Sequence, residues 1–336
     1  MVKLLKNTVG VRFWVGFSGT YWNDEIRMLI DDYKVGGLVL FRRNIIDSEQ
    51  LLDFVSTIQS RALASLGRKL FIAVDQEGGA VRRLSFLENP APRLLANSVD
   101  TIEERQINVS RASTETAQVL RLHGVDVNLA PVLDRVQDET THFLGNRSFG
   151  SDPAEVGLLG SLWIQIHKKH GVYSVAKHFP GLSYALVDPH EHKLSVVWRS
   201  SSDMIADLQP FEAAIRSGVF GVMVSHGIYP LWDPQWPAPL STTVCREWLR
   251  KRLSFGGLVL SDDLDMKAIS DHFPPEIVAE RSTMAAVDCL LVCNNFYHFD
   301  KLYEALCCLI EANSSVREAH HESVCRIEQK FQRRLQ

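Results

Sequence analysis

Short apolar runs alternate with longer amphipathic segments along almost the whole chain. Each run is rich in Val, Ile, Leu and Phe and has few polar interruptions, which predicts a β-strand buried on both faces. The predicted strands cover residues 11–17, 37–41, 70–74, 125–130, 172–176, 219–224, 257–260 and 287–292. Because strands buried on both faces are typical of parallel sheets covered by helices, the pattern favours an α/β protein.

The segments between the runs have helical periodicity and recognisable ends. The predicted helices cover residues 23–32, 48–65, 101–123, 153–170, 203–217, 242–253, 275–286 and 299–312. Pro153 suits the first turn of a helix, and Gly124, Gly171 and Gly218 follow predicted helix ends, where glycine readily takes a left-handed conformation. Eight successive strand–helix units predict a (β/α)8 TIM barrel.

The chain has no proline-rich or serine-rich linker and no low-complexity tract. We therefore expect a single barrel domain over residues 1–312. Residues 313–336 are strongly charged, and their sparse apolar positions include Val324, Ile327 and Phe331. This pattern predicts a C-terminal amphipathic helix that packs on the barrel or frays at its end.

Composition narrows the class of protein. Of the 336 residues, 46% are hydrophobic and 23% charged, which is enough apolar material for a sizeable core. The balance of 36 Lys and Arg against 40 Asp and Glu gives a net charge of −4, which argues against a nucleic-acid partner. No apolar run approaches the roughly 20 residues that a membrane span needs, so no membrane partner is expected.

The N-terminal segment and the cysteines favour the cytoplasm. Arg12 interrupts the first apolar stretch, which therefore indicates a strand better than a secretory signal. The six cysteines lie in the C-terminal third without a CxxC pair, and we expect them to be buried thiols in a reducing compartment.

Polar residues follow five of the eight predicted strands. In a TIM barrel the catalytic groups lie where strands end and the following loops begin, so these positions are candidate site residues. They are Asp75-Gln76-Glu77-Gly78-Gly79, Lys177-His178, Ser225-His226, Ser261-Asp262-Asp263-Leu264-Asp265 and Asn294-Asn295. A lone polar residue at a strand end often only satisfies backbone groups, but five strands sharing the feature favour a site.

Two groups within these loops have more than one interpretation. Asp188 lies two residues before His190, so its carboxylate can orient the imidazole for general acid/base catalysis; a solvated loop explains the same spacing equally well. His190 and His192 could also bind zinc, although no further ligands are evident. The cluster Asp262, Asp263 and Asp265 fits a divalent-metal site, a helix N-cap group, or a nucleophile with supporting acids.

In combination, several motifs resemble the bacterial β-N-acetylhexosaminidases of glycoside hydrolase family 3, of the single-domain type that recycles peptidoglycan. The resemblance extends from about residue 36 to about residue 295. Its motifs are Gly36-Gly37-Leu38-Val39-Leu40-Phe41, Ala73-Val74-Asp75-Gln76-Glu77-Gly78-Gly79 with Val81 and Arg83, Asn128-Leu129-Ala130-Pro131-Val132-Leu133-Asp134, Asn146-Arg147-Ser148-Phe149-Gly150, Lys177-His178-Phe179-Pro180-Gly181, Leu208 with Pro210 and Phe211, and Leu258-Val259-Leu260-Ser261-Asp262-Asp263-Leu264-Asp265-Met266.

The resemblance implies roles for individual residues. Asp262 would be the nucleophile of a retaining exo-β-N-acetylglucosaminidase, and His190, oriented by Asp188, would be the acid/base. Around the sugar, Asp75 would accept hydrogen bonds, and the donors would be Arg83, Arg147, Lys177 and His178. It implies no metal or organic cofactor, a small carbohydrate substrate of muropeptide type, and a cytoplasmic monomer.

The segment that carries His190 departs from the family pattern. Leu182-Ser183-Tyr184 replaces the usual His-Gly, Pro189 replaces a serine between the two dyad residues, and Ala80 replaces an arginine. Two alternatives therefore stay open at this point. The barrel could be a sugar-binding or regulatory protein with little hydrolysis, or a family 3 enzyme with a shifted substrate or phosphorolytic activity. Arg147 could also be only a salt-bridge partner, and Lys177 could merely neutralise nearby acids.

Overall fold

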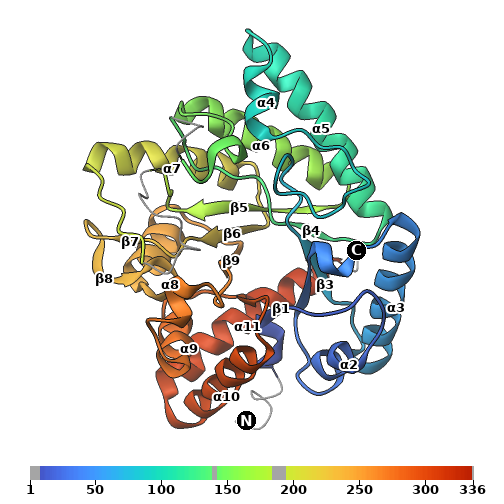
Figure 1. Cartoon of the computed structure of the whole chain (residues 1–336). Helices are drawn as coiled ribbons and strands as arrows, with labels where there is room; N and C mark the ends of the chain where they lie inside the picture. The colour runs from blue at the N-terminus through green and yellow to red at the C-terminus, as the bar shows by residue number, and fades with distance from the viewer. Residues whose placement is uncertain (1–7, 138–141, 184–193, 335–336) are drawn as a thin grey trace.

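The structure is a computed structural model that describes residues 8–137, 142–183 and 194–334. Its main sheet contains eight parallel strands in the order β10-β1-β2-β3-β4-β5-β6-β9 (Figure 1). The strands are β1 (Phe13–Gly16), β2 (Gly37–Leu40), β3 (Phe71–Val74), β4 (Val127–Asn128), β5 (Tyr173–Phe179), β6 (Gly221–Val224), β9 (Leu258–Ser261) and β10 (Leu290–Val292). A parallel bridge between Leu260 and Cys289 joins the two ends of this order. The predicted (β/α)8 barrel is confirmed.

Helices surround the sheet, one after nearly every strand (Figure 1). They are α2 (Asp24–Asp31), α3 (Ser48–Leu66), α4 (Pro92–Asn97), α5 (Ile102–Leu122), α6 (Pro153–Lys169), α7 (Ser201–Arg216), α8 (Lys267–Ser270), α9 (Pro275–Met284), α10 (Phe296–Ala312) and α11 (Ser314–Arg334), with a π-type helix at Thr243–Arg252. The eight predicted helices all have counterparts, although α10 begins three residues earlier than expected. The short helices α4 and α8 were not expected.

Local chemistry explains where the helices begin and end. Asp47 and Asp152 cap α3 and α6 by accepting a hydrogen bond from a backbone N–H in the first turn. Thr101 and Glu104 form a capping box at the start of α5. The glycines predicted to end α5, α6 and α7, which are Gly124, Gly171 and Gly218, all have positive φ, between 70° and 76°.

A second, antiparallel pair of strands was not expected. Strands β7 (Ile228–Tyr229) and β8 (Asp233–Pro237) form a hairpin after β6. Val196 forms a parallel bridge to Ile228, so the segment before α7 lies beside this hairpin. Both strands are short, and β8 contains Pro234 and Pro237, which explains why the apolar pattern did not reveal them.

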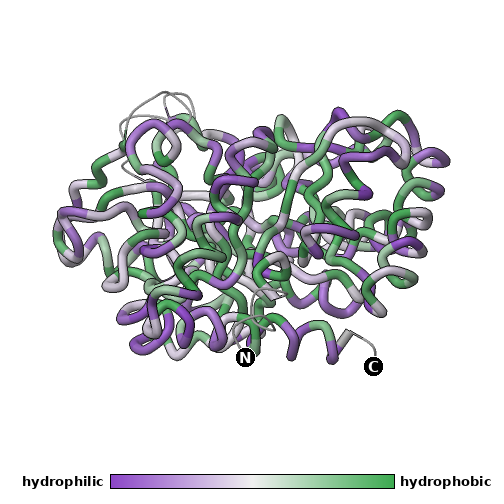
Figure 2. Tube along the Cα trace, turned by 90° about the horizontal axis from the view of Figure 1, so that it is seen from below, coloured by the Kyte–Doolittle hydropathy of each residue, from purple (hydrophilic) through white to green (hydrophobic). Residues whose placement is uncertain are grey.

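Two apolar clusters fill the molecule. The larger lies between the sheet and the helices and includes Phe13, Phe54, Phe211 and Phe299. The smaller contains alternate residues of the same strands, such as Trp14 and Phe71, and so occupies the inside of the barrel. Figure 2 shows the corresponding hydrophobic segments inside the fold and hydrophilic segments on its outer turns.

The last helix, α11, closes one end of the barrel. Its residues Val324, Ile327 and Phe331 belong to the cluster inside the barrel, and the ring of Phe331 stacks on Phe71 at 4.5 Å. The Arg68 guanidinium lies 4.5 Å from the centre of the same Phe331 ring. These apolar positions are the ones that the sequence pattern singled out.

The expectation for the cysteines is partly wrong. Cys245, Cys289 and Cys293 are buried, but Cys307 is half-buried and Cys308 and Cys325 are exposed. The helices α10 and α11 have outward faces on which these thiols lie, and the sequence pattern did not distinguish those faces. Among the described residues, no helix is long and apolar enough to cross a membrane.

Candidate active site

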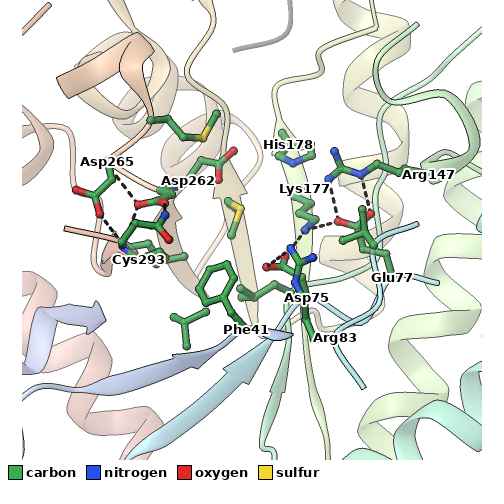
Figure 3. A pocket seen from close by; sticks show the side chains of 18 of the residues that line it. Phe41, Asp75, Glu77, Arg83, Arg147, Lys177, His178, Asp262, Asp265 and Cys293 are labelled. Carbon is green, nitrogen blue, oxygen red and sulfur yellow. Dashed lines mark hydrogen bonds and ion pairs between the residues drawn. The ribbon is translucent and has the colours of Figure 1, made fainter. Parts of the chain in front are cut away.

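A cavity of about 500 Å³ opens at the carboxyl ends of the barrel strands. Its polar lining comes from β5 and from the segments after β3, β9 and β10, together with Arg147 from the segment before α6. Figure 3 shows two polar walls with Phe41 between them: Asp262 and Asp265 on one side, and Asp75, Lys177 and their neighbours on the other. Strand ends supply most of the polar groups of the cavity, as expected for this fold.

One wall is a chain of alternating charges. Arg147 donates two hydrogen bonds to Glu77, at 2.7 and 2.8 Å, and Lys177 Nζ lies 2.5 Å from the same carboxylate. Lys177 also donates to Asp75 at 2.7 Å, and Arg83 lies 3.8 Å from Asp75. The wall therefore presents three cations and two carboxylates, which suits a neutral polar ligand with many hydroxyl groups.

Glu77 has the most buried carboxylate of this wall, with a side-chain exposure of 1%. Burial alone would raise its pKa, but Arg147 and Lys177 outweigh burial and hold the pKa of Glu77 well below its usual range. Burial likewise lowers the pKa of Lys177, while Asp75 and Glu77 raise it above the ordinary value overall. The ionised network is therefore the stable form at neutral pH.

The turn after β3 places these acids in the cavity. Gly78 and Gly79 have φ values of 108° and 59°, and a Cβ on Gly78 would lie 2.2 Å from the Pro90 carbonyl oxygen, so a side chain does not fit there. The buried Gln76 side chain accepts hydrogen bonds from the backbone N–H groups of Arg83 and Leu84. The turn thus orients Asp75, Glu77 and Arg83 together.

His178 is held by a buried carboxylate. Its Nδ1 lies 2.7 Å from Asp134 Oδ2, and its backbone N–H donates to the same oxygen at 3.1 Å. The other oxygen of Asp134 accepts from the Leu182 N–H at 2.7 Å. Asp134 therefore fixes the imidazole and the strand exit that follows it.

Asp262 comes directly after β9 and points into the cavity (Figure 3). Its N–H donates to the Val224 carbonyl at 3.2 Å, and its Oδ1 accepts from the Asp263 N–H at 2.8 Å. Burial opposes ionisation, but His178 and His226 outweigh burial and lower the pKa of Asp262 below its usual value. A partly buried, ionised carboxylate on a rigid strand end can act as a nucleophile.

The other two acids of the predicted cluster also line the cavity, but their carboxylates are hydrogen-bonded to the segment after β10. Asp263 accepts hydrogen bonds from the Cys293 N–H and the Asn294 side chain, both at 3.0 Å. Asp265 pairs with His298 at 2.7 Å and accepts from the N–H groups of Asn294 and Asn295. Burial and then the nearby Asp265 raise the pKa of Asp263 to about 7.

The structure brings six of the eight predicted site residues together around this cavity. They are Asp75, Arg83, Arg147, Lys177, His178 and Asp262. Two donor nitrogens of Arg147 bond to Glu77, so the salt bridge that the sequence offered as an alternative interpretation is present. The other two predicted residues, His190 and Asp188, lie outside the described residues, as does His192.

Sequence reasoning gave no role to Glu77, Asp134 or His226, although all three lie in strand-end segments or motifs that it quoted. The signal that could have found them is the presence of several lysine, arginine and histidine side chains at the same barrel end, which need carboxylate partners once buried. Within the described part of the chain, no three His, Cys, Asp or Glu residues are grouped as metal ligands would be. The metal interpretation of the Asp262 cluster therefore has no support there.

Comparison with known proteins decides the family. The family model described as the glycosyl hydrolase family 3 N-terminal domain matches residues 6–329. The chain belongs to glycosyl hydrolase family 3. A curated β-hexosaminidase of Nitrosomonas eutropha is 33% identical to it over 307 residues, which cover 90% of this chain and 86% of the relative.

Solved structures of family 3 proteins have the same fold. A β-N-acetylglucosaminidase from a Paenibacillus strain aligns with a TM-score of 0.91 and 31% identity, over 98% of this chain and 62% of that one. Native NagZ from Neisseria gonorrhoeae aligns with a TM-score of 0.78 and 27% identity, over 94% and 97% of the two chains. This family 3 chain thus spans about three fifths of the Paenibacillus protein and nearly all of the Neisseria one.

Proposed function

We propose that this protein is a retaining exo-β-N-acetylglucosaminidase that removes terminal β-linked N-acetylglucosamine. The observation that carries the proposal is Asp262, an ionised carboxylate held on a strand end and directed into a cavity whose opposite wall is lined with hydrogen-bonding groups. Family 3 membership and relatives named β-hexosaminidase or β-N-acetylglucosaminidase support the reaction type.

In the proposed first step, Asp262 attacks the anomeric carbon and forms a glycosyl ester as the bond to the leaving oxygen breaks. That oxygen takes a proton from protonated His190, which Asp188 orients. In the second step neutral His190 removes a proton from water, the resulting hydroxide attacks the anomeric carbon, and Asp262 leaves as a carboxylate. Two inversions give net retention.

The charged wall would bind the sugar. Lys177, Arg83 and the N–H groups of Arg147 that do not bond to Glu77 would donate hydrogen bonds to sugar hydroxyls. Asp75 would accept a hydrogen bond from the sugar, and His178 would be a further polar contact. Charge-assisted hydrogen bonds are strong and directional, so they can hold one ring at the nucleophile. A muropeptide-type substrate, a cytoplasmic location and a monomeric state remain parts of this proposal.

Turnover of an aryl N-acetyl-β-D-glucosaminide tests the proposal. We expect the parent protein to release the phenol and the β-anomer of N-acetylglucosamine, and the Asp262→Asn and His190→Ala variants to lose most of this activity. Full activity in Asp262→Asn would refute the nucleophile. Sugar binding without turnover by the parent would favour a binding protein, and formation of a sugar 1-phosphate in added phosphate would favour phosphorolysis.

A further inference from the structure

Side chains add to the backbone hydrogen bonds at the barrel seam next to the nucleophile, where the backbone N–H groups of Ser261 and Leu264 donate to the carbonyls of Cys289 and Leu291. Between β9 and β10 the backbone forms one isolated bridge, at Leu260 and Cys289, whereas the other described seams have registers of two to four residues. At this seam Ser261 Oγ accepts from the Leu291 N–H at 3.0 Å, and Asp263 Oδ1 accepts from the Cys293 N–H at 3.0 Å. Farther along, Asp265 Oδ2 accepts from the N–H groups of Asn294 and Asn295 at 2.7 and 2.9 Å.

The alternation along β9 explains the direction of Asp262. Successive side chains of a strand lie on opposite faces of the sheet, and Leu258 and Leu260 belong to the cluster inside the barrel. Asp262, two positions after Leu260, therefore lies on the same inner side. Figure 3 shows its carboxylate directed into the cavity. The Asp263 N–H donates to Asp262 Oδ1 at 2.8 Å, and His226 Nε2 lies 2.8 Å from the Asp263 carbonyl oxygen. Both ends of the Asp263 backbone are therefore held.

Hydrogen bonds through Asn294 and Arg43 connect the Asp263 side chain to two further loops of the barrel. Its Oδ2 accepts from Asn294 Nδ2 at 3.0 Å, and Asn294 Oδ1 accepts from Arg43 Nη1 at 2.9 Å. Arg43 also donates to the carbonyls of Phe17 and Cys293, after β1 and β10. The planar guanidinium thus connects the segments after β1, β2 and β10 to one carboxylate beside Asp262.

We propose that Asp263, held by Asn294 and Arg43, is the positioning residue that fixes the angle of the nucleophile Asp262 across the β9–β10 seam. The proposal rests on the proposed function, because it assumes that Asp262 attacks the sugar. Both carboxylate oxygens of Asp263 accept hydrogen bonds from backbone and side-chain N–H groups of the seam, including the Asp265 N–H at 3.0 Å. Asp263 therefore acts through Asp262 and not on the substrate.

Exchanging the donor and acceptor of the Asp263–Asn294 pair tests this role. In Asp263→Asn, the carbonyl oxygen can still accept from the Cys293 and Asp265 N–H groups, but its amide faces the Asn294 amide, so two donors meet. In Asn294→Asp, two carboxylates meet. The double variant restores one donor and one acceptor, keeps the charge of the pair, and leaves an oxygen for Arg43.

We expect kcat to fall at least about tenfold in each single variant and to return to within about threefold of the parent in the double variant, because small misplacements of a reacting group are costly. The Kd of N-acetylglucosamine, a ground-state ligand, should stay within about twofold throughout. Rescue by the exchanged pair cannot arise from two independent roles. Asp47→Asn, an exchange between equivalent N-cap residues at the same barrel end, is the matched control and should leave kcat unchanged.

Two results would overturn the inference. One is a kcat near that of the parent in both single variants; the other is a double variant no faster than the slower single variant, which would mean that the Asp263 charge acts directly. If the single variants do not fold, Asn294→Ala removes the side-chain pair but keeps the Asn294 backbone N–H on Asp265, and an unchanged kcat in that variant also refutes the role. If the parent hydrolyses the aryl glycoside and Asp262→Asn does not, the proposed function is supported. A failed exchange of Asp263 and Asn294 then refutes this inference alone.

Discussion

Replacing Glu77 by glutamine removes the charge that holds Lys177 and Arg147 together. The carboxylate is almost fully buried and receives three charge-assisted contacts, at 2.5, 2.7 and 2.8 Å. Glutamine keeps one acceptor oxygen but turns an amide group toward one of the two cations. Removing one partner of a buried ion pair costs about 3–5 kcal/mol, and because one acceptor remains we expect a loss near the lower end, about 3 kcal/mol of unfolding free energy.

Urea unfolding followed by circular dichroism at neutral pH measures this loss, and the chain offers a matched control. Glu155 pairs with Arg105 at 2.7 Å, but both side chains are about a quarter exposed, so Glu155→Gln should cost less than about 1 kcal/mol. A loss below about 1 kcal/mol in Glu77→Gln would refute the argument that this buried network stabilises the fold.

The Glu77 network also predicts how stability changes with pH. The pKa of Glu77 is lower in the folded protein than its ordinary 4.5, so its stabilising contribution is fully present above about pH 4.5 and is lost as the pH falls through the folded-state value. The free-energy difference between the parent and Glu77→Gln should therefore be smaller near pH 3 than at pH 7. An equal difference at both pH values would contradict the lowered pKa.

Three further perturbations follow from the same structure. Phe331→Ala should lower the unfolding free energy by about 3–5 kcal/mol in urea titrations, because the ring is stacked on Phe71 inside the barrel, while Phe331→Leu should cost clearly less; equal effects would contradict the packing argument. Asp207→Asn should cost about 3 kcal/mol in the same assay, since it leaves the buried Arg199 side chain without its carboxylate partner, and a neutral result would refute this pairing. If His190 is the acid/base, kcat/KM should fall on both sides of a near-neutral optimum, and Asp188→Asn should shift one limb; an unaltered profile would argue against the dyad.

The arrangement of side chains around the cavity was only partly predictable from the sequence. Asp75 and Lys177 follow apolar runs directly, and Asp262 follows one after a single serine. In a parallel barrel all strand ends meet at one face, so their proximity could be expected. Which acid pairs with which base could not. Glu77 and Lys177 are a hundred positions apart, and their contact depends on the tilt of β3 against β5 and on the turn at Gly78.

The sequence by itself determined the fold class, the element order, most helix ends and the apolar face of the last helix, because periodicity, N-caps and glycine stops act over a few neighbouring residues. Only the tertiary structure decided which of Asp262, Asp263 and Asp265 bond to the segment after β10. Three acids within four positions look alike in a sequence. Only closure of the barrel brings the backbone N–H groups that follow β10 alongside β9, where they bond to the carboxylates of Asp263 and Asp265 and not to that of Asp262.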